Sequence, residues 1–454
     1  MKEAYAKLLL CLQIVLWLSP PPEARPVPAI AAYRLDDSAS HPPALLSATG
    51  LYRDLSARPR ALTDSIHPYA VNAPSWNDGA RKDHFVSVPF GSAIVPTDSD
   101  NYRIPDGTVF IENLSLDTIA GDTSSRILIE TRFLTVSTLD AYPYYSGLSY
   151  RWRRDQSDAD LVPPRLGADA GIGVRVGGLP RAVAWRFPTQ AECNRCHVPV
   201  SRGAPGFITP QLNRPSLQAP GKGQLQELAD LGALAFNPAA GKPDGFRWRN
   251  LDDTGAGLEP RARSYLAANC SHCHGNAYNN HAVLSFEYFN PAQPFAYSAD
   301  HNYQGYLDRP RDGDAAYPRL MYAGRPDSSF ILKRLLSRGT PEKPDGNQMP
   351  PLGTYRVDSA GVNLLRDWLC GLGEADGSTA LDSVKQASAC RLPDVDPVDP
   401  FVTGLGPRGA RGNRSESHDR NALPGALGPG KSYAARSQAI FPYHRWMFDA
   451  EGRH

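Results

Sequence analysis

Two copies of the pattern C-x-x-C-H constrain this chain more than any other feature. The first lies in AECNRCHVP and the second in NCSHCHGN. In this attachment signature of c-type haem, two cysteine thiols form thioethers and the adjacent histidine binds the iron. The sequence therefore predicts two haem c groups. The predicted thioether residues are Cys193, Cys196, Cys270 and Cys273, and the predicted iron ligands next to them are His197 and His274.

Zinc is the main alternative, because two C-x-x-C pairs supply four thiolates. Zinc ribbons separate such pairs by about 15–20 residues, whereas a much longer stretch separates Cys196 from Cys270. Zinc also gives no reason for a histidine directly after each pair. A thioredoxin-like redox motif needs a βαβ context, which neither motif has. These points favour haem. His272, inside the second motif, is expected to be a surface or loop residue rather than a ligand.

A methionine loop follows the second motif. It reads NQMPPLG and contains Met349, between two segments with apolar helical stripes. A thioether is a soft ligand for haem iron, and His/Met ligation raises the reduction potential. The sequence predicts Met349 as the second axial ligand of the haem at the second motif. Ordinary packing is the alternative role for this side chain.

The first motif has no equally close ligand. Apart from His197, the stretch between Cys196 and Cys270 contains neither methionine nor histidine. A lysine, a tyrosine or an open position are further alternatives. A six-coordinate haem carries electrons, whereas an open position binds small ligands or reacts with peroxide. The candidate ligands from elsewhere in the chain are Met321, His84, His67 and Met447.

The N-terminus has the pattern of a secretory signal. Lys2 and Lys7 precede an apolar run that ends at Leu18, and SPPPEA follows. This run of eleven residues is too short to cross a bilayer, which takes about 20. We expect a signal peptide over residues 1–32, a periplasmic or otherwise exported protein, and no integral membrane span after cleavage. An uncleaved interfacial anchor is the alternative.

Export changes how the remaining cysteines are interpreted. Cys11 lies inside the apolar run and is expected to be lost with the signal. Cys370 and Cys390 lie outside the two motifs, and an oxidising compartment favours a disulfide between them. Two unpaired thiols are the alternative.

The predicted fold class is α+β. Several segments between residues 84 and 186 alternate apolar and polar residues between turn signals, which is typical of an antiparallel β-sandwich-like domain. The rest of the cytochrome region is expected to be mainly helical. The predicted divisions are 33–186 for the β-rich domain, 187–255 for the first haem region, 256–391 for a second, cytochrome c-like haem domain, and 392–454 for a disordered tail.

The formal net charge of +1 gives no indication of nucleic-acid binding. The sequence favours a periplasmic dihaem c-type cytochrome that transfers single electrons between a donor protein and an acceptor protein. Whether it is an enzyme stays open, with a carrier favoured over a catalyst and no catalytic residue assigned. The alternative is a dihaem peroxidase-like enzyme with an open coordination position at the first haem. A carbohydrate-binding or protein-binding role of the β-rich domain is a further alternative.

The chain resembles a family of exported dihaem c-type cytochromes often found beside parallel β-helix repeat proteins. The resemblance covers about residues 45–372 and rests on the order and spacing of many stretches. Among them are HPYAVNAPSWNDGARKDHFVSVPFG, WRFPTQAECNRCH, ARSYLAANCSHCHG, GRPDSSFILKRL and MPPLG. It implies one haem on each motif, with Met349 as the distal ligand of the second. Cys370 and the tail beyond about residue 392 depart from the family pattern.

Overall fold

The structure is a computed structural model. It describes residue 30 and residues 41–57, 59–97, 102–139, 142–198, 203–204, 206–240, 247–274, 315–339 and 345–372. The predicted signal peptide, apart from Ile30, lies outside the described residues, as do the tail 392–454, Cys390 and Met447. A search of the described part of the chain finds no helix that is long and apolar enough to cross a membrane.

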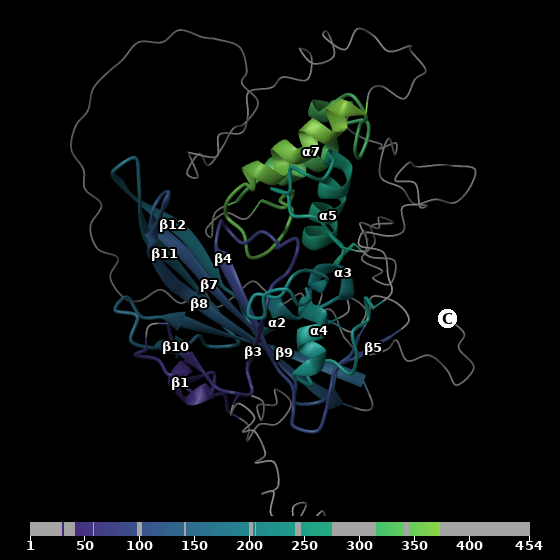
Figure 1. The fold of residues 1–454 in the computed structure, drawn as a ribbon. Helices are drawn as coiled ribbons and strands as arrows, with labels where there is room; N and C mark the ends of the chain where they lie inside the picture. Colours follow the sequence, from purple (N-terminus) through teal and green to yellow (C-terminus); the bar gives the residue numbers. More distant parts are fainter. Residues whose placement is uncertain are drawn as a thin grey trace, which may run out of the picture. The chain divides into compact units, whose positions relative to one another are not determined.

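An eight-stranded sheet contains most of the secondary structure (Figure 1). Four antiparallel neighbours form its centre, in the order β4 (Arg81–Ser87), β7 (Val109–Ile119), β8 (Asp122–Leu139) and β9 (Tyr142–Trp152). Around them lie β3 (His67–Tyr69), β10 (Ala159–Leu161) and the hairpin of β11 (Ala168–Val176) with β12 (Leu179–Phe187). Two small sheets pair β1 (Tyr52–Asp54) with β2 (Ala61–Leu62) and β5 (Val95–Pro96) with β6 (Tyr102–Arg103).

The sheet buries side chains on both faces, because successive residues of a strand point to opposite sides. Phe110 pairs with Leu134 on one face, and Ile111 pairs with Phe133 on the other. Each pair belongs to a different buried apolar cluster. VFIENLSL therefore carries apolar residues that point to both sides of the sheet, because both sides are buried.

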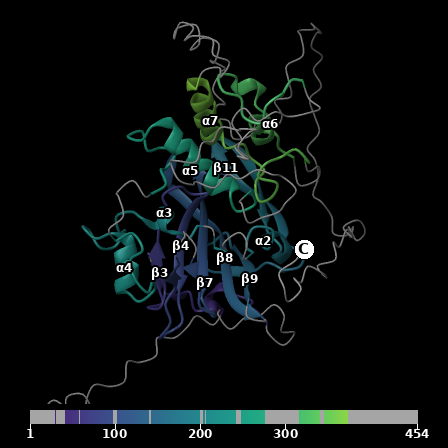
Figure 2. The same ribbon diagram turned by 90° about the vertical axis from the view of Figure 1, so that its right-hand side faces the viewer.

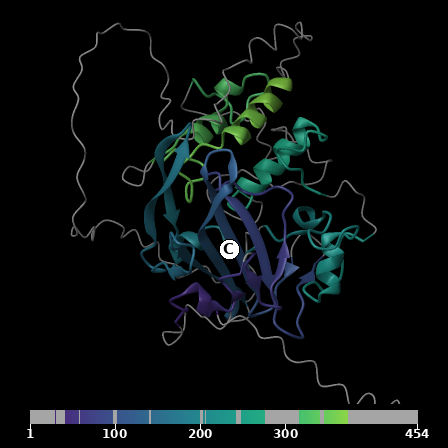
Figure 3. The same cartoon turned by 60° about the vertical axis from the view of Figure 1, so that its left-hand side comes forward.

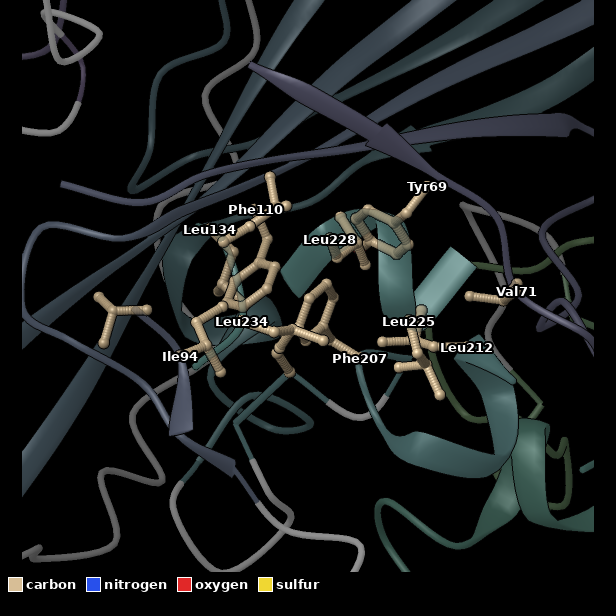
Figure 4. Close-up of a cluster of buried hydrophobic side chains, with 14 of the residues drawn as sticks. Tyr69, Val71, Ile94, Phe110, Leu134, Phe207, Leu212, Leu225, Leu228 and Leu234 are labelled. Carbon is tan, nitrogen blue, oxygen red and sulfur yellow. The ribbon is translucent and has the colours of Figure 1, made fainter. Parts of the chain in front are cut away.

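Short helices that follow the sheet in sequence cover one of its faces. They are α2 (Gln190–Cys193), α3 (Thr209–Leu212) and α4 (Gln224–Asp230). Phe207 contacts Phe110 with ring centroids 5.1 Å apart, and Leu225 and Leu228 of α4 complete the cluster with Leu134 (Figure 4). The region between the first motif and residue 240 thus shares its core with the β-sheet.

Three helices and two 3-10 turns complete the described elements. They are α5 (Leu258–Cys270), α6 (Phe330–Leu336), α7 (Ser359–Gly371), η2 (Leu46–Thr49) and η5 (Pro326–Ser328). Helices α5 and α7 contact each other beside one end of the sheet (Figure 3). Tyr265 and Trp368 are both buried in the cluster between them. Asp358 caps α7 by accepting the Gly361 N–H.

The predicted fold class is wrong. One large antiparallel sheet dominates, and no sheet of comparable size faces it within the described ranges. Among the residues that the structure describes after residue 187, the helices are short and strands carry more of the chain overall, so the region is not a mainly helical cytochrome domain. Alternation along a strand shows that one side is buried, but it does not show whether the covering layer is a second sheet or helices and loops. Here α3, α4 and the loops around them cover one face of the sheet (Figure 2).

Candidate cofactor site

Both motifs line one cavity of about 860 Å³. Its wall combines the two motifs, the methionine loop and one face of the sheet. The sequence predicted the members of each site, whereas the structure adds that the two sites adjoin. The predicted haem and iron residues on this wall are Cys193, Cys196, His197, Cys270, Cys273, His274 and Met349.

The first motif is held against strand β9. Helix α2 begins with a capping box in which Thr189 accepts the Glu192 N–H and the Glu192 side chain accepts the Thr189 N–H. At its end, Cys193 meets Gly147. A Cβ on Gly147 would lie 2.6 Å from Cys193 Sγ, so only glycine lets the motif approach the strand this closely.

His197 has one ring nitrogen fixed by the backbone. Its Nδ1 lies 2.7 Å from the carbonyl oxygen of Gly203, which can only accept, so Nδ1 carries the proton and Nε2 keeps its lone pair. Gly203 has φ of 61° and packs on the ring of Tyr145, where a Cβ would clash. Burial lowers the pKa of His197 and favours the neutral imidazole that binds metals.

The second motif begins at the last residue of α5. The backbone N–H of His274 donates to the carbonyl of Cys270 at 2.8 Å, which continues the turn beyond the helix. Asn269, directly before the motif, is fixed on both sides. Its Nδ2 donates to the Tyr265 carbonyl at 2.9 Å and its Oδ1 accepts the Trp76 N–H at 2.7 Å. Burial lowers the pKa of His274 as well.

A bridging segment, residues 75–78, ties the second motif to the methionine loop. The backbone N–H of Trp76 donates to Asn269 Oδ1, as described above. Its indole N–H donates to the Arg356 carbonyl at 3.1 Å. Asn77 Nδ2 donates to the Gly353 carbonyl at 3.0 Å. The loop is also held at Met349, whose N–H donates to the Arg334 carbonyl at 3.0 Å. The segment thus positions both residues predicted to bind the second iron.

Asp78 ends this segment as a buried carboxylate. It accepts the N–H groups of Tyr355 at 2.9 Å and Arg356 at 2.8 Å. Burial raises the pKa of Asp78 to about 6, against the effect of these hydrogen bonds. Its backbone φ of 52° is the left-handed conformation, which aspartate and asparagine tolerate better than most residues.

The two motifs touch through their second cysteines. Cys196 Sγ lies 3.8 Å from Cys273 Sγ, and a ring nitrogen of His272 completes a group whose donor atoms lie within 4.8 Å of one another. The hydrogen bond from Cys196 lowers the pKa of the Cys273 thiol, whereas burial raises the pKa of Cys193 and of Cys270 to about 12. His272 lies in the turn of the second motif and is half-buried, and its ring also lines the cavity beside the two cysteines.

A charged cluster that the sequence motifs do not predict lies on the sheet and faces the two motifs. Glu112 Oε1 lies 3.1 Å from Lys82 Nζ and 3.3 Å from His84 Nε2, and Arg132 forms paired hydrogen bonds at 2.9 Å with Glu130. The sequence does contain a signal for this cluster. Glu112 and Arg132 lie in VFIENLSL and ILIETRFL at strand positions where the neighbours on the same face, Phe110 and Leu134, are apolar.

The structure distinguishes among the candidates for the sixth ligand of the iron at the first motif by their positions relative to the cavity. Met321 is fully buried in the cluster between α5 and α7, and its packing role is the one observed. His84 lines the cavity, whereas Met321 and His67 do not. Met447 lies outside the described residues. Cys370 lies in α7 and takes part in a disulfide; because Cys390 is outside the described residues, the predicted pairing stays a prediction.

The donor set fits haem c at each motif. Each motif supplies two cysteines and a histidine on the cavity wall, and His197 has the orienting hydrogen bond that metal-binding histidines use. The cavity volume lies within the range of about 300–1,000 Å³ typical of cofactor sites. Comparison of the chain with family models, with curated proteins and with solved structures finds no match.

Proposed function

We propose that this chain is an exported dihaem c-type protein that carries single electrons between a donor protein and an acceptor protein. One haem c is held by Cys193, Cys196 and His197. The other is held by Cys270, Cys273 and His274, with Met349 as its second axial ligand. Haem iron supplies one-electron chemistry by alternating between Fe(II) and Fe(III). The proposal places the chain in the exported dihaem family that its sequence resembles.

The observation that carries the proposal is the convergence of both motifs and Met349 on one cavity. Two cofactors attached there lie next to each other, which suits electron transfer between them. The protein's own contribution is positional. Gly203 orients His197, the bridging segment fixes the methionine loop, and the apolar residues of the wall exclude water from the cofactor.

Structural zinc is the second candidate, and one distance favours it. Two sulfur ligands of a tetrahedral zinc lie about 3.8 Å apart, since Zn–S bonds are about 2.3 Å. The Cys196 and Cys273 sulfurs have this separation. The donor group that includes them has three members among the described residues, whereas a structural zinc needs four. The cavity is also much larger than a single ion requires.

Separate cysteine variants of the two motifs test the proposal. Full-length protein from an export-competent host with haem-attachment machinery is expected to gain the mass of two haems. The double variant Cys193→Ala/Cys196→Ala is expected to retain one, and so is Cys270→Ala/Cys273→Ala. Cys370→Ser is the matched control, because it removes a cysteine outside both motifs, and it is expected to retain two. A wild-type mass without added haem contradicts the proposal.

A further inference from the structure

A polar row crosses the sheet face that lines the cavity. His84 on β4 pairs with Glu112 on β7, and Glu112 pairs with Arg132 on β8. Cross-strand partners project to the same face, and all three side chains line the cavity. The next row on this face consists of Val86, Phe110 and Leu134, all buried and apolar. Burying charged groups is unfavourable, and the pairs that Glu112 makes with Lys82 and His84, and Arg132 with Glu130, offset this cost.

The row lies on the first motif's side of the cavity. Cys193 contacts Gly147, and Gly147 pairs with Leu134, which is two residues from Arg132 on the same strand face. His197, which follows Cys196 in the first motif, lines the same cavity as the row.

His84 is the member of the row with a ligand atom to offer. Arg132 has no acceptor nitrogen, and Lys82 on the same wall already donates to Ser75 Oγ at 2.9 Å and pairs with Glu112. Lys82 Nζ lies 3.1 Å from Glu112 Oε1 and Arg132 Nη1 lies 3.7 Å from Glu112 Oε2, so two permanent cations flank this carboxylate. An ionised carboxylate can only accept, so His84 Nε2 carries the proton and Nδ1 keeps its lone pair.

We propose that His84 is the second axial ligand of the iron at the first motif, and that Glu112 is the positioning residue that fixes its ring. This inference rests on the proposed function. A carboxylate behind a metal-binding histidine fixes the tautomer and raises the basicity of the ligand. Tyr69 packs against the imidazole with ring centroids 5.3 Å apart and restricts its rotation.

Two different axial pairs make the two sites unequal. His/Met ligation raises the reduction potential, so a bis-histidine site at the first motif has the lower potential of the two. The chain then contains a lower-potential site beside a higher-potential one. An electron that enters at the first motif is passed to the second, and this sets the direction of transfer inside the molecule.

The test is near-infrared magnetic circular dichroism of the ferric full-length protein, with haem content measured on every sample. Wild type is expected to show one bis-histidine and one histidine–methionine low-spin haem. His84→Ala is expected to convert the bis-histidine signal to high spin, to leave the other signal unchanged and to recover low spin with added imidazole. His67→Ala is the matched control, since His67 lies on the adjacent strand away from the cavity wall, and it is expected to match wild type.

Two results overturn the inference while leaving the proposed function intact. One is a haem-loaded wild type with a high-spin haem or without a bis-histidine signal, the outcome that favours the peroxidase-like alternative. The other is a His84→Ala protein with two haems and an unchanged spectrum. A wild type without haem instead contradicts the proposed function itself. If His84→Ala fails to accumulate, Glu112→Gln gives a second test: both low-spin signals are expected to stay, and the potential of the bis-histidine site is expected to rise.

Discussion

At the level of single residues, the close approach of Cys193 to Gly147 is the contact most sensitive to a small change. A methyl group on Gly147 would lie 2.6 Å from both Cys193 Cβ and Cys193 Sγ, far inside van der Waals contact. We expect Gly147→Ala to displace the first motif from β9 and to reduce haem attachment there, while the second motif keeps its haem. Haem content per chain, measured on purified protein, is expected to fall from two toward one.

Gly173→Ala is the matched control for this change. Gly173 is also a strand glycine, on β11, but a Cβ there meets no atom within 4 Å. The control is expected to retain both haems. Equal haem content in Gly147→Ala and Gly173→Ala contradicts the claim that this contact positions Cys193.

Asp78 makes a pH-dependent contribution to stability. Its pKa in the folded protein is raised from 3.8 to about 6, so between these values the folded state binds more protons than the unfolded state. The free energy of unfolding therefore falls as pH rises through this range, by about 3 kcal/mol for a shift of this size. Asp78→Asn keeps an oxygen acceptor for Tyr355 and Arg356 and removes this contribution.

Urea unfolding of both proteins at about pH 4 and about pH 7 measures this contribution. Other groups titrate in the same range, so the quantity of interest is the difference between wild type and Asp78→Asn. The wild type is expected to lose more free energy of unfolding than the variant across the interval. Parallel losses in the two proteins show that Asp78 does not carry the effect.

At the level of elements, hydrogen bonds from the bridging segment, residues 75–78, connect helix α5 to the methionine loop and hold the two in position relative to each other. We expect Met349→Ala to abolish the sulfur–iron charge-transfer band and to lower the reduction potential of the second haem, since His/Met ligation raises that potential.

Met321→Ala is the control for this change. Met321 is fully buried in the α5–α7 cluster, so its loss is expected to cost about 2–5 kcal/mol of stability and to leave both haem spectra unchanged. An unchanged spectrum in Met349→Ala contradicts the ligand assignment.

The local elements were predictable and their assembly was not. The alternating stretches became strands β4, β7, β8 and β9, and the segment with an apolar stripe after the methionine loop became α7. Periodicity carries no information about which layer covers a sheet, so the β-sandwich-like arrangement was wrong. The charged row was missed because its members lie on three strands and become neighbours only through their register.

At the level of the whole molecule, the fold brings together what the chain separates. Cys196 and Cys273 are 77 residues apart in sequence and 3.8 Å apart in space. The long gap between the motifs was an argument against zinc, and this contact removes it. What now separates haem from zinc is the histidine after each pair, the cavity volume and the position of Met349 on its wall. A long-range contact of this kind depends on the complete sheet, so no local pattern predicts it.

Haem and zinc content of the exported wild-type protein tests the central claim most directly. A pyridine haemochrome assay gives the haem per chain, and elemental analysis of the same sample gives the zinc. We predict two covalently bound haems and no stoichiometric zinc. One zinc per chain without haem, from cells that attach haem to a known c-type cytochrome, contradicts the proposal and favours a zinc site at Cys196, His272 and Cys273.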